Sequence, residues 1–585
     1  MARLDGRKRA SVVVMLCIAT ALAAPAQTFT TLVSFDFANG ADPTGRLAQG
    51  RDGKLYGTTE NGGYLACNDA NGCGTVFKIT RGGALTELYA FCAQDGCTDG
   101  SFPVAGLTLA MDGNFYGTTI LGGKGNCIDG CGTVFGVSSV GKLTTVYSFC
   151  LQNTCPPGGD NPYGALSQAS DGNFYGTTAA GGISDADCSE FGGCGTVFRI
   201  TPAGRLTTLY NFDFSDGAVP NQMLVQGVDG NLYGTTSLGG DPTCDAPFGC
   251  GTAFKLTPQG RLTTLHRFDL ADGIYPSELV QAPDGTFYGV TFLGGDPTCD
   301  TPFGCGTVFK ITPRGTLTTL HSFGGTDGAR PSGGLIQATD GNFYGTTSLG
   351  GDLTCNDADG CGTVFQITPD GSLSTLHVFE ASDGLDPFGG LLQATNGIIY
   401  GTTAYGGNFD CSLTNGCGTI FSLDMGLGPF VRQVRDSGKV GVPEGLLGQG
   451  LTGTTSVSFN GTPAQFKVVS DTFLKATVPN GATTGYVSLT TPSGRLTSNK
   501  PFRVTPQLLS FDPPGGPVGT QVTITGVSLT QTKGVDFGNR IPARFTVNSD
   551  TQVAATVPQG AKTGKIGIET KGGIAISSGT FTVTP

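Results

Sequence analysis

The sequence predicts an all-β protein in which a seven-bladed β-propeller precedes two immunoglobulin-like β-sandwiches. Three observations support this prediction: a phrase close to "FYGTT" occurs seven times, each copy is followed by a phrase close to "CGTVF", and the repeat ends near residue 429. Gly accounts for 97 of 585 residues, and charged residues for only 13%. Because glycine disfavours helices, this composition favours short strands joined by turns.

Residues 1–26 have the features of a cleaved secretory signal peptide. The basic segment "RLDGRKRA" precedes the apolar run "SVVVMLCIATAL", and the small residues "APA" precede Gln27. The apolar run is shorter than the roughly 20 residues that a membrane-spanning helix needs. We therefore expect cleavage after Ala26, no membrane span, and an exported protein located outside the cell, at the cell surface or in the periplasm.

The seven "FYGTT" phrases divide the next part of the chain into units of similar length. Their tyrosines are 55 to 60 residues apart, at positions 56, 116, 175, 233, 288, 344 and 400. In one full unit, residues 332–379, four apolar runs are separated by "TDG", a cysteine loop and "PDG". Each unit is therefore predicted to form a four-stranded antiparallel sheet. Such a sheet cannot bury both faces alone, and repeated four-stranded units are typical of a β-propeller.

The two ends of the repeated region predict a closed ring. The seventh unit ends at "CGTIFSLD", residues 417–424, without a fourth strand, whereas an unmatched "FTTLVSF" occurs at residues 29–35. If this N-terminal strand completes the last blade, the ring has seven full sheets and few free strand edges. We assign residues 27–428 to the propeller.

The repeated phrases also resemble a known family. "DGNFYGTT", "GCGTVFKITP" and "FxxxDGxxP" recur, exactly or with small changes, over residues 28–424. In these phrases the chain resembles the bacterial GloVer tandem repeats of choice-of-anchor exported proteins. Members of that family are secreted or surface proteins with varied C-terminal anchors. The resemblance therefore implies where the protein is located, outside the cell or at its surface, but it does not imply a particular activity.

Two similar units, residues 429–505 and 506–585, follow the ring. Both are rich in Val and Thr in alternating runs, which predicts immunoglobulin-like sandwiches. The second copy resembles IPT/TIG domains through the pattern "GxxGTxVTIxGxxL", followed by "VPxGxxTG". In exported bacterial proteins, such domains usually act as spacers or adhesive modules. In the first copy, "VPE" at residues 442–444 replaces Thr-x-Val, so we expect an irregular strand there.

All cysteines after Cys17 fall into close pairs, which predicts disulfide bonds. An even count is typical of disulfides in an exported chain, whereas zinc needs four ligands and redox centres favour C-x-x-C. Each bridge closes a short loop and should add about 2 kcal/mol of stability. The predicted pairs are Cys67–Cys73, Cys92–Cys97, Cys127–Cys131, Cys150–Cys155, Cys188–Cys194, Cys244–Cys250, Cys299–Cys305, Cys355–Cys361 and Cys411–Cys417.

The predicted topology places all nine bridges on one face of the ring. In an up-and-down blade, the loop between the second and third strands emerges on the same side as the connection to the next blade. We call this side the stapled face. Because it also carries the long loops, it is the expected binding face.

The aspartates of the repeated "DGxxP" phrase are candidate metal ligands. Asp-Gly is ordinary turn chemistry, which is the simpler interpretation. The alternative is a ring of carboxylates that coordinates Ca²⁺ through oxygen atoms, and we expect no other cofactor. The candidates are Asp99, Asp216, Asp272, Asp327 and Asp383.

No catalytic constellation can be assembled from the sequence. His266, His321 and His377 share one repeat position at which earlier units have tyrosine, so we expect a packing role rather than acid–base catalysis. A glycosidase needs a pair of unique carboxylates. The non-repeated candidates are Glu60, Glu190 and Glu278, and nothing in the sequence pairs them.

The charge distribution excludes nucleic acid as the expected partner. The chain carries −12 overall, but residues 429–585 contain 14 basic and 7 acidic side chains and the signal peptide is also basic, which leaves −22 on residues 27–428. Such an acidic surface repels phosphate backbones. The sequence thus predicts an exported, non-catalytic scaffold or adhesion protein that presents the stapled face to an extracellular glycan or protein. The alternative is an enzyme that acts on extracellular polysaccharide in the propeller channel.

Overall fold

The computed structural model describes residues 27–64, 67, 71–125, 127, 129–150, 159–183, 187–189, 192–411 and 415–585. The predicted signal peptide, Cys155 and Glu190 lie outside the described residues. Strands dominate, and helical segments are short 3-10 turns such as η2 (Asp95–Cys97) and η5 (Asn356–Ala358). The all-β prediction is confirmed. Within the described parts of the chain, no helix has the length and apolar character needed to cross a membrane.

The repeated region forms seven small antiparallel sheets with their strands in chain order, except that two short strands share one partner in the fifth and sixth sheets and that the chain ends meet in the seventh. The first four sheets contain β2 (Ala48–Gln49), β3 (Leu55–Thr59), β4 (Thr75–Ile79) and β5 (Leu85–Ala90); β6 (Thr108–Leu109), β7 (Phe115–Thr119), β8 (Thr133–Val137) and β9 (Leu143–Ser148); β10 (Ser167–Gln168), β11 (Phe174–Thr178), β12 (Thr196–Ile200) and β13 (Leu206–Asn211); and β14 (Val225–Gln226), β15 (Leu232–Thr236), β16 (Thr252–Leu256) and β17 (Leu262–Arg267).

The last three sheets follow the same plan. They contain β18 (Ile274–Pro276), β19 (Val280–Gln281), β20 (Phe287–Leu293), β21 (Thr307–Ile311) and β22 (Leu317–Ser322); β23 (Ala329–Pro331), β24 (Ile336–Gln337), β25 (Phe343–Leu349), β26 (Thr363–Ile367) and β27 (Leu373–Val378); and β28 (Leu392–Gln393), β29 (Ile399–Thr403), β30 (Thr419–Asp424) and β1 (Thr28–Ser34). The strand that precedes each "FYGTT" strand is only two residues long, which is shorter than the apolar run in the sequence suggests.

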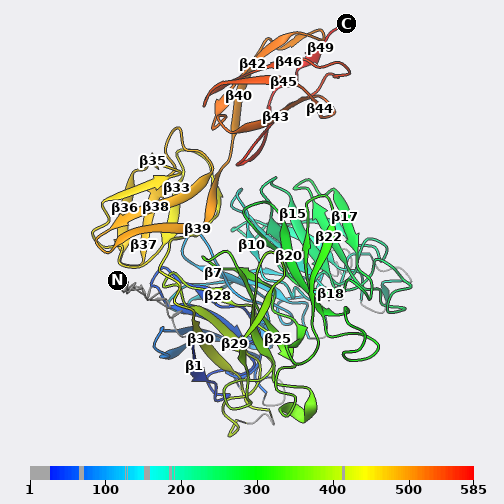
Figure 1. Ribbon diagram of the computed structural model, residues 1–585, viewed down its shortest axis with the longest axis vertical. Coiled ribbons are helices and arrows are strands. Elements are labelled where there is room, and N and C mark those ends of the chain that lie inside the picture. The colour runs from blue at the N-terminus through cyan, green and yellow to red at the C-terminus, as the bar shows by residue number, and fades with distance from the viewer. Residues whose placement is uncertain are drawn as a thin grey trace, which may run out of the picture.

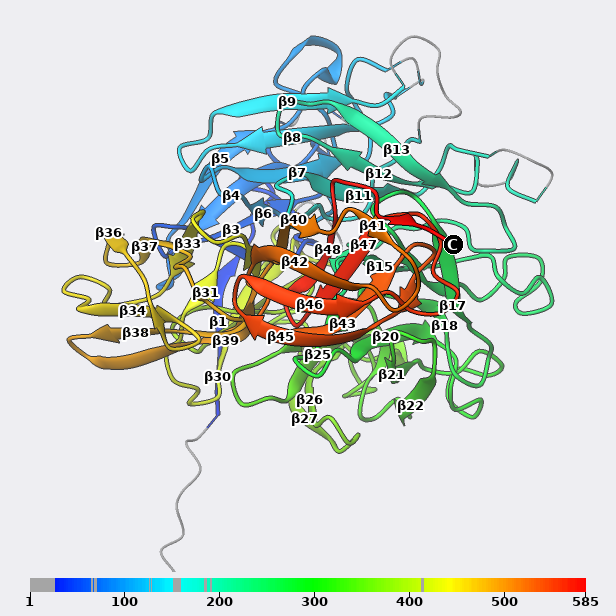
Figure 2. The ribbon, with the colours of Figure 1, turned by 90° about the horizontal axis from the view of Figure 1, so that it is seen from above.

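The sheets close into a ring (Figure 2). As predicted, the N-terminal strand β1 completes the seventh sheet by pairing antiparallel with β30. A phenylalanine after each fourth strand packs edge-on against a phenylalanine in the next sheet, with ring centroids 5.1 to 5.4 Å apart. The seven pairs are Phe91–Phe135, Phe149–Phe198, Phe212–Phe254, Phe268–Phe309, Phe323–Phe365, Phe379–Phe421 and, closing the circle, Phe35–Phe77.

The "YGTT" phrase is repeated because each of its residues has a packing role. In the first sheet, Tyr56 stacks on Phe115 of the next sheet, and its hydroxyl donates to Asp52 of the preceding turn at 2.9 Å. A Cβ atom at Gly57 would lie 2.5 Å from the Phe77 ring, so this position excludes larger residues. The hydroxyls of Thr59 and its partner in β4 are 2.9 Å apart and buried. The repeat thus encodes the interior of the ring.

Residues 432–504 form two sheets that pack around one hydrophobic core, the first sandwich. Leu446 and Leu474 of one sheet meet Phe459 and Phe502 of the other. The strands are β31 (Arg432–Gln433), β33 (Pro443–Leu447), β37 (Phe473–Thr477) and β36 (Phe466–Ser470) in one sheet, and β32 (Ser437–Gly438), β39 (Gly494–Val504), β38 (Gly485–Thr491), β34 (Ser456–Phe459) and β35 (Thr462–Pro463) in the other.

One expectation about this sandwich is wrong. The strand at "VPE" was expected to be irregular, yet β33 pairs with β37 without a register shift from Pro443 to Leu447. Proline is tolerated because it occupies the first position of the strand. Glu444 is fully buried in the same strand, and Arg435 compensates its charge at 2.9 Å.

Residues 507–583 form the second sandwich. In Figure 1 it lies at the top of the view, above the ring and the first sandwich. Its core contains Val522 and Ile524 of one sheet and Phe537 and Ile568 of the other. The strands are β40 (Gln507–Asp512), β42 (Gln521–Val527), β46 (Gln552–Thr556) and β45 (Arg544–Ser549); β44 (Ile541–Pro542), β43 (Thr532–Phe537), β47 (Ile566–Thr570) and β48 (Gly573–Ile576); and the parallel pair β41 (Gly515–Gly516) and β49 (Thr582–Val583).

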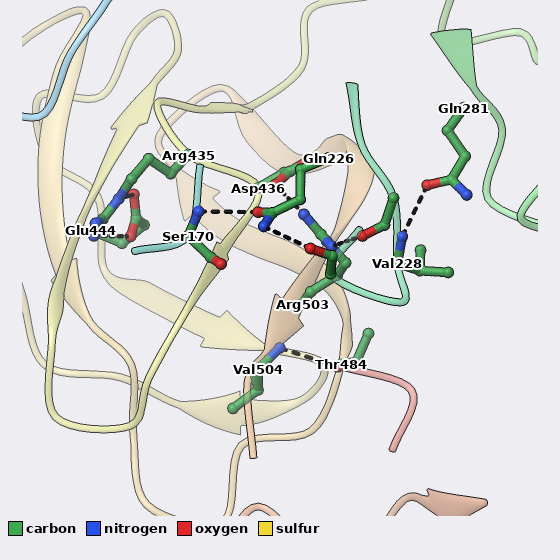
Figure 3. Close-up of polar contacts among 12 residues, drawn as sticks. Ser170, Gln226, Val228, Gln281, Arg435, Asp436, Glu444, Thr484, Arg503 and Val504 are labelled. Atoms are coloured by element: carbon green, nitrogen blue, oxygen red, sulfur yellow. Dashed lines mark hydrogen bonds and ion pairs between the residues drawn. The ribbon is translucent and has the colours of Figure 1, made fainter. Parts of the chain in front are cut away.

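The first sandwich covers the ring face that carries the Asp-Gly turns, which we call the capped face. Arg503 donates to the Gly227 carbonyl at 2.6 Å and to Asp436 at 2.8 Å (Figure 3). Thr472 donates to the Arg51 carbonyl at 2.6 Å, and the Arg51 guanidinium lies 4.6 Å from the centre of a phenylalanine ring of the sandwich. The sandwich, which also contacts Gln393 and Thr395, therefore touches the ring in its first, fourth and seventh repeats, leaving the stapled face as the uncovered side.

Candidate ligand site on the stapled face

Eight disulfide bonds join the predicted pairs. They are Cys67–Cys73, Cys92–Cys97, Cys127–Cys131, Cys188–Cys194, Cys244–Cys250, Cys299–Cys305, Cys355–Cys361 and Cys411–Cys417. Cys150 is also disulfide-bonded, while its predicted partner lies outside the described residues. In the first repeat two bridges touch, with the sulfur atoms of Cys67 and Cys92 3.3 Å apart.

Each repeat places one residue with a left-handed backbone at the entrance to its first strand, directly before a proline. We call these seven residues the rim. Their φ values lie between 52° and 57°, although none is glycine. That conformation is uncommon for side-chain-bearing residues and strained for a β-branched one such as Val219. The rim residues are Asp42, Phe102, Asn161, Val219, Tyr275, Arg330 and Asp386.

The disulfide loops hold the rim in place. The Tyr275 amide donates to the carbonyl oxygen of Cys250 at 3.2 Å, and the Arg330 amide donates to that of Cys305 at 2.8 Å. The same bond recurs around the ring, always from a rim residue to the second cysteine of the preceding loop. The remaining donors and acceptors are Asp42 to Cys417, Phe102 to Cys73, Asn161 to Cys131, Val219 to Cys194 and Asp386 to Cys361. The staples therefore support seven left-handed backbone positions as well as their own loops.

A cavity of about 690 Å³ lies within the ring on the stapled face. Its walls come from the starts of the first strands and the ends of the second strands, and all seven repeats contribute. The walls combine aromatic and charged side chains that the repeat does not conserve from unit to unit. These are Tyr163, Tyr275, Phe292, Phe388 and Tyr405, with Arg46, Glu60, Glu278 and Asp386.

Acidic groups gather where the seventh repeat meets the first. Burial raises the pKa of Asp386 to about 6, and one of its oxygen atoms is buried without a partner among the described residues. Burial likewise raises the pKa of Asp42 to about 6, although Asn61 donates to its carboxylate at 2.6 Å. Burial and the nearby charge of Asp42 raise the pKa of Glu60. After burial, the charges of these three carboxylates raise the pKa of Tyr405 on the cavity wall.

An ion pair crosses the ring beneath this cavity. Arg46 of the first repeat lies 3.1 Å from Glu278 of the fifth and 3.7 Å from the sulfur of Met223. These residues also line a second cavity, of about 310 Å³, between the ring and the first sandwich. The Arg46–Glu278 pair therefore separates two spaces within one channel.

The five calcium candidates are engaged in their own turns and do not converge. Asp272 accepts hydrogen bonds from His266 at 2.6 Å and from the Asp269 amide at 2.9 Å. Asp327 and Asp383 accept in the same way from a histidine and a turn amide, and Asp99 and Asp216 accept from a tyrosine and a backbone amide. Among the described residues, clusters of three metal-ligand types contain only cysteines.

Calcium binding stays a prediction, and thermal melting with and without millimolar Ca²⁺ tests it. An unchanged melting temperature would contradict it. The three histidines, as expected, have structural contacts: each bonds to its aspartate and packs edge-on against a phenylalanine two residues later.

The cavity lies on the face that the sequence predicts for binding, but the rim was not predicted. Glu60 and Glu278 were considered as unpaired carboxylates, and both line the cavity. The repeated residues of the sequence do not reveal the rim, because the rim is the position that changes. The signal is the variable residue directly before the repeated proline of "DGxxP" and its variants.

Comparisons with known proteins agree with the repeated sequence. A family model of the Gloeobacter/Verrucomicrobia repeat matches residues 20–246 and 243–462. No curated protein matches the chain. Similar solved structures include a fungal alcohol oxidase in complex with copper, 12% identical, with a TM-score of 0.44 over 95% of this chain and 99% of that one.

Two further solved structures show weaker similarity. The surface glycan-binding protein PbSGBP-B from Prevotella bryantii is 20% identical, with a TM-score of 0.21 over 26% of this chain and 41% of that one. The extracellular domain of a hybrid two-component system from B. thetaiotaomicron is 12% identical, with a TM-score of 0.41 over 95% of this chain and 58% of that one. At TM-scores below 0.5, these similarities carry no argument about what the chain binds.

Proposed function

The chain belongs to the Gloeobacter/Verrucomicrobia repeat family, and from this premise we propose that it is an exported, non-catalytic protein that binds an extracellular glycan. The ligand occupies the cavity on the stapled face. We further propose that the ring of seven sheets is a seven-bladed β-propeller and that the two sandwiches are IPT/TIG domains acting as spacers. Closure by β1 and the "GxxGTxVTIxGxxL" pattern support these two assignments.

One observation carries the proposal: a cavity of about 690 Å³ is lined by side chains that differ from repeat to repeat. Ligand sites commonly have such volumes, with apolar walls and a few polar groups that orient the ligand. Five aromatic rings offer faces for sugar rings, while Glu60, Asp386 and Asn221 offer acceptors and donors for hydroxyl groups. The sequence contains no tryptophan, so tyrosine and phenylalanine supply these ring faces.

A glycan array with the full chain tests this function. Phe388 lines the cavity and is 45% exposed, so Phe388→Ala should fold normally. We expect it to weaken binding of any glycan that the wild-type chain retains by about tenfold, since one stacked ring is worth about 1 kcal/mol or more. The matched control is Phe409→Ala, which is 53% exposed on a stapled loop outside the cavity wall. Equal losses in both variants, or no glycan bound, would contradict the proposal.

The competing function is hydrolysis of an extracellular polysaccharide in the same cavity. The raised pKa of Asp386, about 6, supports it because a general acid must remain protonated near neutral pH. Glycoside hydrolysis also needs a second carboxylate, for which Glu60 is the candidate on the same wall. Release of reducing ends from a polysaccharide panel, abolished by Asp386→Asn, would favour the enzyme over the binding protein.

A further inference from the structure

The second cavity lies where the first sandwich meets the ring. Its volume is about 310 Å³, and its ring side is formed by the short first strands of the repeats. Arg432, Arg435, Asp436 and Lys500 of the sandwich form the other side. The glutamines of the first strands are occupied by the ring itself: Gln226 accepts from the Ser170 amide and Gln281 from the Val228 amide (Figure 3).

Every carboxylate at this junction already has an arginine partner. Glu278 pairs with Arg46 at 3.1 Å, Asp436 with Arg503 at 2.8 Å, and the buried Glu444 with Arg435 at 2.9 Å. Figure 3 shows the last two pairs on the sandwich side. Three negative charges are thus neutralised by three arginines, and none is left over.

Arg432 and Lys500 are the two cations that these three pairs leave over. Neither forms an ion pair with a carboxylate in the described part of the chain. Arg432 donates only a long hydrogen bond, 3.4 Å, to the Gln393 carbonyl. The junction therefore carries two more positive than negative side chains beside a cavity.

Two half-buried cations in excess beside one cavity are unfavourable for the empty protein. Burying a charge without a partner carries a penalty of several kcal/mol in general. Burial, together with the charge of Arg46, lowers the pKa of Arg432 to about 10. Burial lowers the pKa of Lys500. The charges of Asp436 and Glu278 oppose this effect, and the charges of Arg432 and Arg46 add to it. An anion between these groups would relieve both the burial penalty and the mutual repulsion.

We propose that the cavity between the ring and the first sandwich binds a tetrahedral oxyanion of the phosphate or sulfate type between Arg432 and Lys500. The guanidinium of Arg432 offers several donors to such an anion, and the ammonium of Lys500 acts as a point charge. The cavity volume accommodates the anion with a few water molecules, because each water takes about 30 Å³. This site is independent of glycan binding on the stapled face.

The site would also join the ring to the sandwich. The anion would contact Arg432 of β31 and Lys500 of β39, and the same two strands carry hydrogen bonds to the ring, from Arg432 to Gln393 and from Arg503 to Gly227. Binding would therefore stabilise the junction, since a ligand that binds only the folded state raises its stability by mass action.

Thermal unfolding of the full chain with inorganic phosphate tests the proposal. The solutions contain either a few millimolar sodium phosphate or sodium chloride of equal ionic strength. We expect phosphate to raise the melting temperature of the wild-type chain by about 2 °C or more. In Lys500→Gln and in Arg432→Gln, the phosphate-dependent rise should disappear. In chloride alone, Lys500→Gln should melt at or above the wild-type temperature, because an unpaired charge is removed.

A matched control and a direct measurement complete the test. Lys467→Gln removes an exposed lysine from β36 of the same sandwich and should keep the full phosphate response. Equilibrium dialysis with labelled phosphate should show one ion per wild-type chain and none per Arg432→Gln chain. No phosphate response in the wild-type chain, or equal responses in the wild-type chain and both cavity variants, would overturn the proposal. If Lys500→Gln fails to fold, the Arg432→Gln comparison decides.

Discussion

The two faces of the ring differ in how much their residues vary from repeat to repeat. On the capped face, each turn repeats nearly the same residues, such as Asp52 hydrogen-bonded to Tyr56 and Asp229 to Tyr233, and the first sandwich contacts these turns. On the stapled face, disulfide loops support a rim whose residues differ in almost every repeat. The repeated residues build the scaffold, and variable residues, among them Val219, Tyr275 and Asp386 of the rim, line the cavity.

This difference has a physical reason. Turns on the capped face are short and gain their stability from hydrogen bonds within the ring and from the sandwich. Loops on the stapled face are long and exposed, so local cross-links replace packing as their support. A rim that is held by backbone bonds to these loops can change its side chains without loss of the fold. The following variants compare the two faces, from the largest expected effect to the smallest.

Removing Arg435 should have the largest effect. Arg435→Met leaves the fully buried Glu444 carboxylate without a cation, and breaking a buried pair in this way is expected to lower the free energy of unfolding by about 3–5 kcal/mol. Urea unfolding at pH 8 measures the loss. The double variant Arg435→Met/Glu444→Gln should recover most of it, and a double variant as unstable as the single one would contradict the explanation.

Asp42 on the rim should make stability depend on pH. Its pKa is raised from 3.8 to about 6 by burial, so the neutral form is favoured in the folded chain. This contribution is fully present below pH 3.8 and is lost as the pH rises through 6, by about 2–3 kcal/mol in total. Asp42→Asn should flatten this part of the curve of stability against pH. The control variant Asp95→Asn, at an exposed aspartate, should leave the curve unchanged. A curve unchanged by Asp42→Asn would refute the assignment.

Loss of one staple should have a moderate effect confined to its own face. Cys244→Ser/Cys250→Ser should lower the free energy of unfolding by about 2 kcal/mol. Because the Tyr275 amide bonds to the Cys250 carbonyl, its hydrogen exchange should accelerate. The Gly230 amide, bonded to Gly227 on the capped face, serves as the internal control. Equal acceleration at both amides would show that the staple supports the whole ring rather than the rim.

The exposed ion pair of the rim should matter least. Arg330 and Asp300 lie 2.7 Å apart, with 37% and 42% of their side chains exposed. Exposed pairs contribute about 0–1 kcal/mol, so Arg330→Met should change the free energy of unfolding by no more than that. Unfolding at low and high salt measures the difference. A loss comparable to that of Arg435→Met would remove the distinction between the faces.

Much of the architecture follows from local patterns. The seven units, the disulfide partners and the N-terminal strand that completes the last sheet could all be predicted, because each depends on residues close in sequence or on a repeat with a missing part. The regular strand at Pro443 was not predicted, since its register depends on a partner strand and on the ion pair of Glu444.

The cavity itself was decided by the tertiary structure. Arg46 and Glu278 are 232 residues apart in sequence, and only closure of the ring brings them within 3.1 Å. Likewise, Asp42 and Asp386 become neighbours of Tyr405 because the last repeat meets the first. The sequence by itself determined the scaffold, since each unit carries its own hydrophobic pattern and turn residues. Which variable side chains share one space depends on the curvature and closure of seven packed sheets, which no single segment specifies.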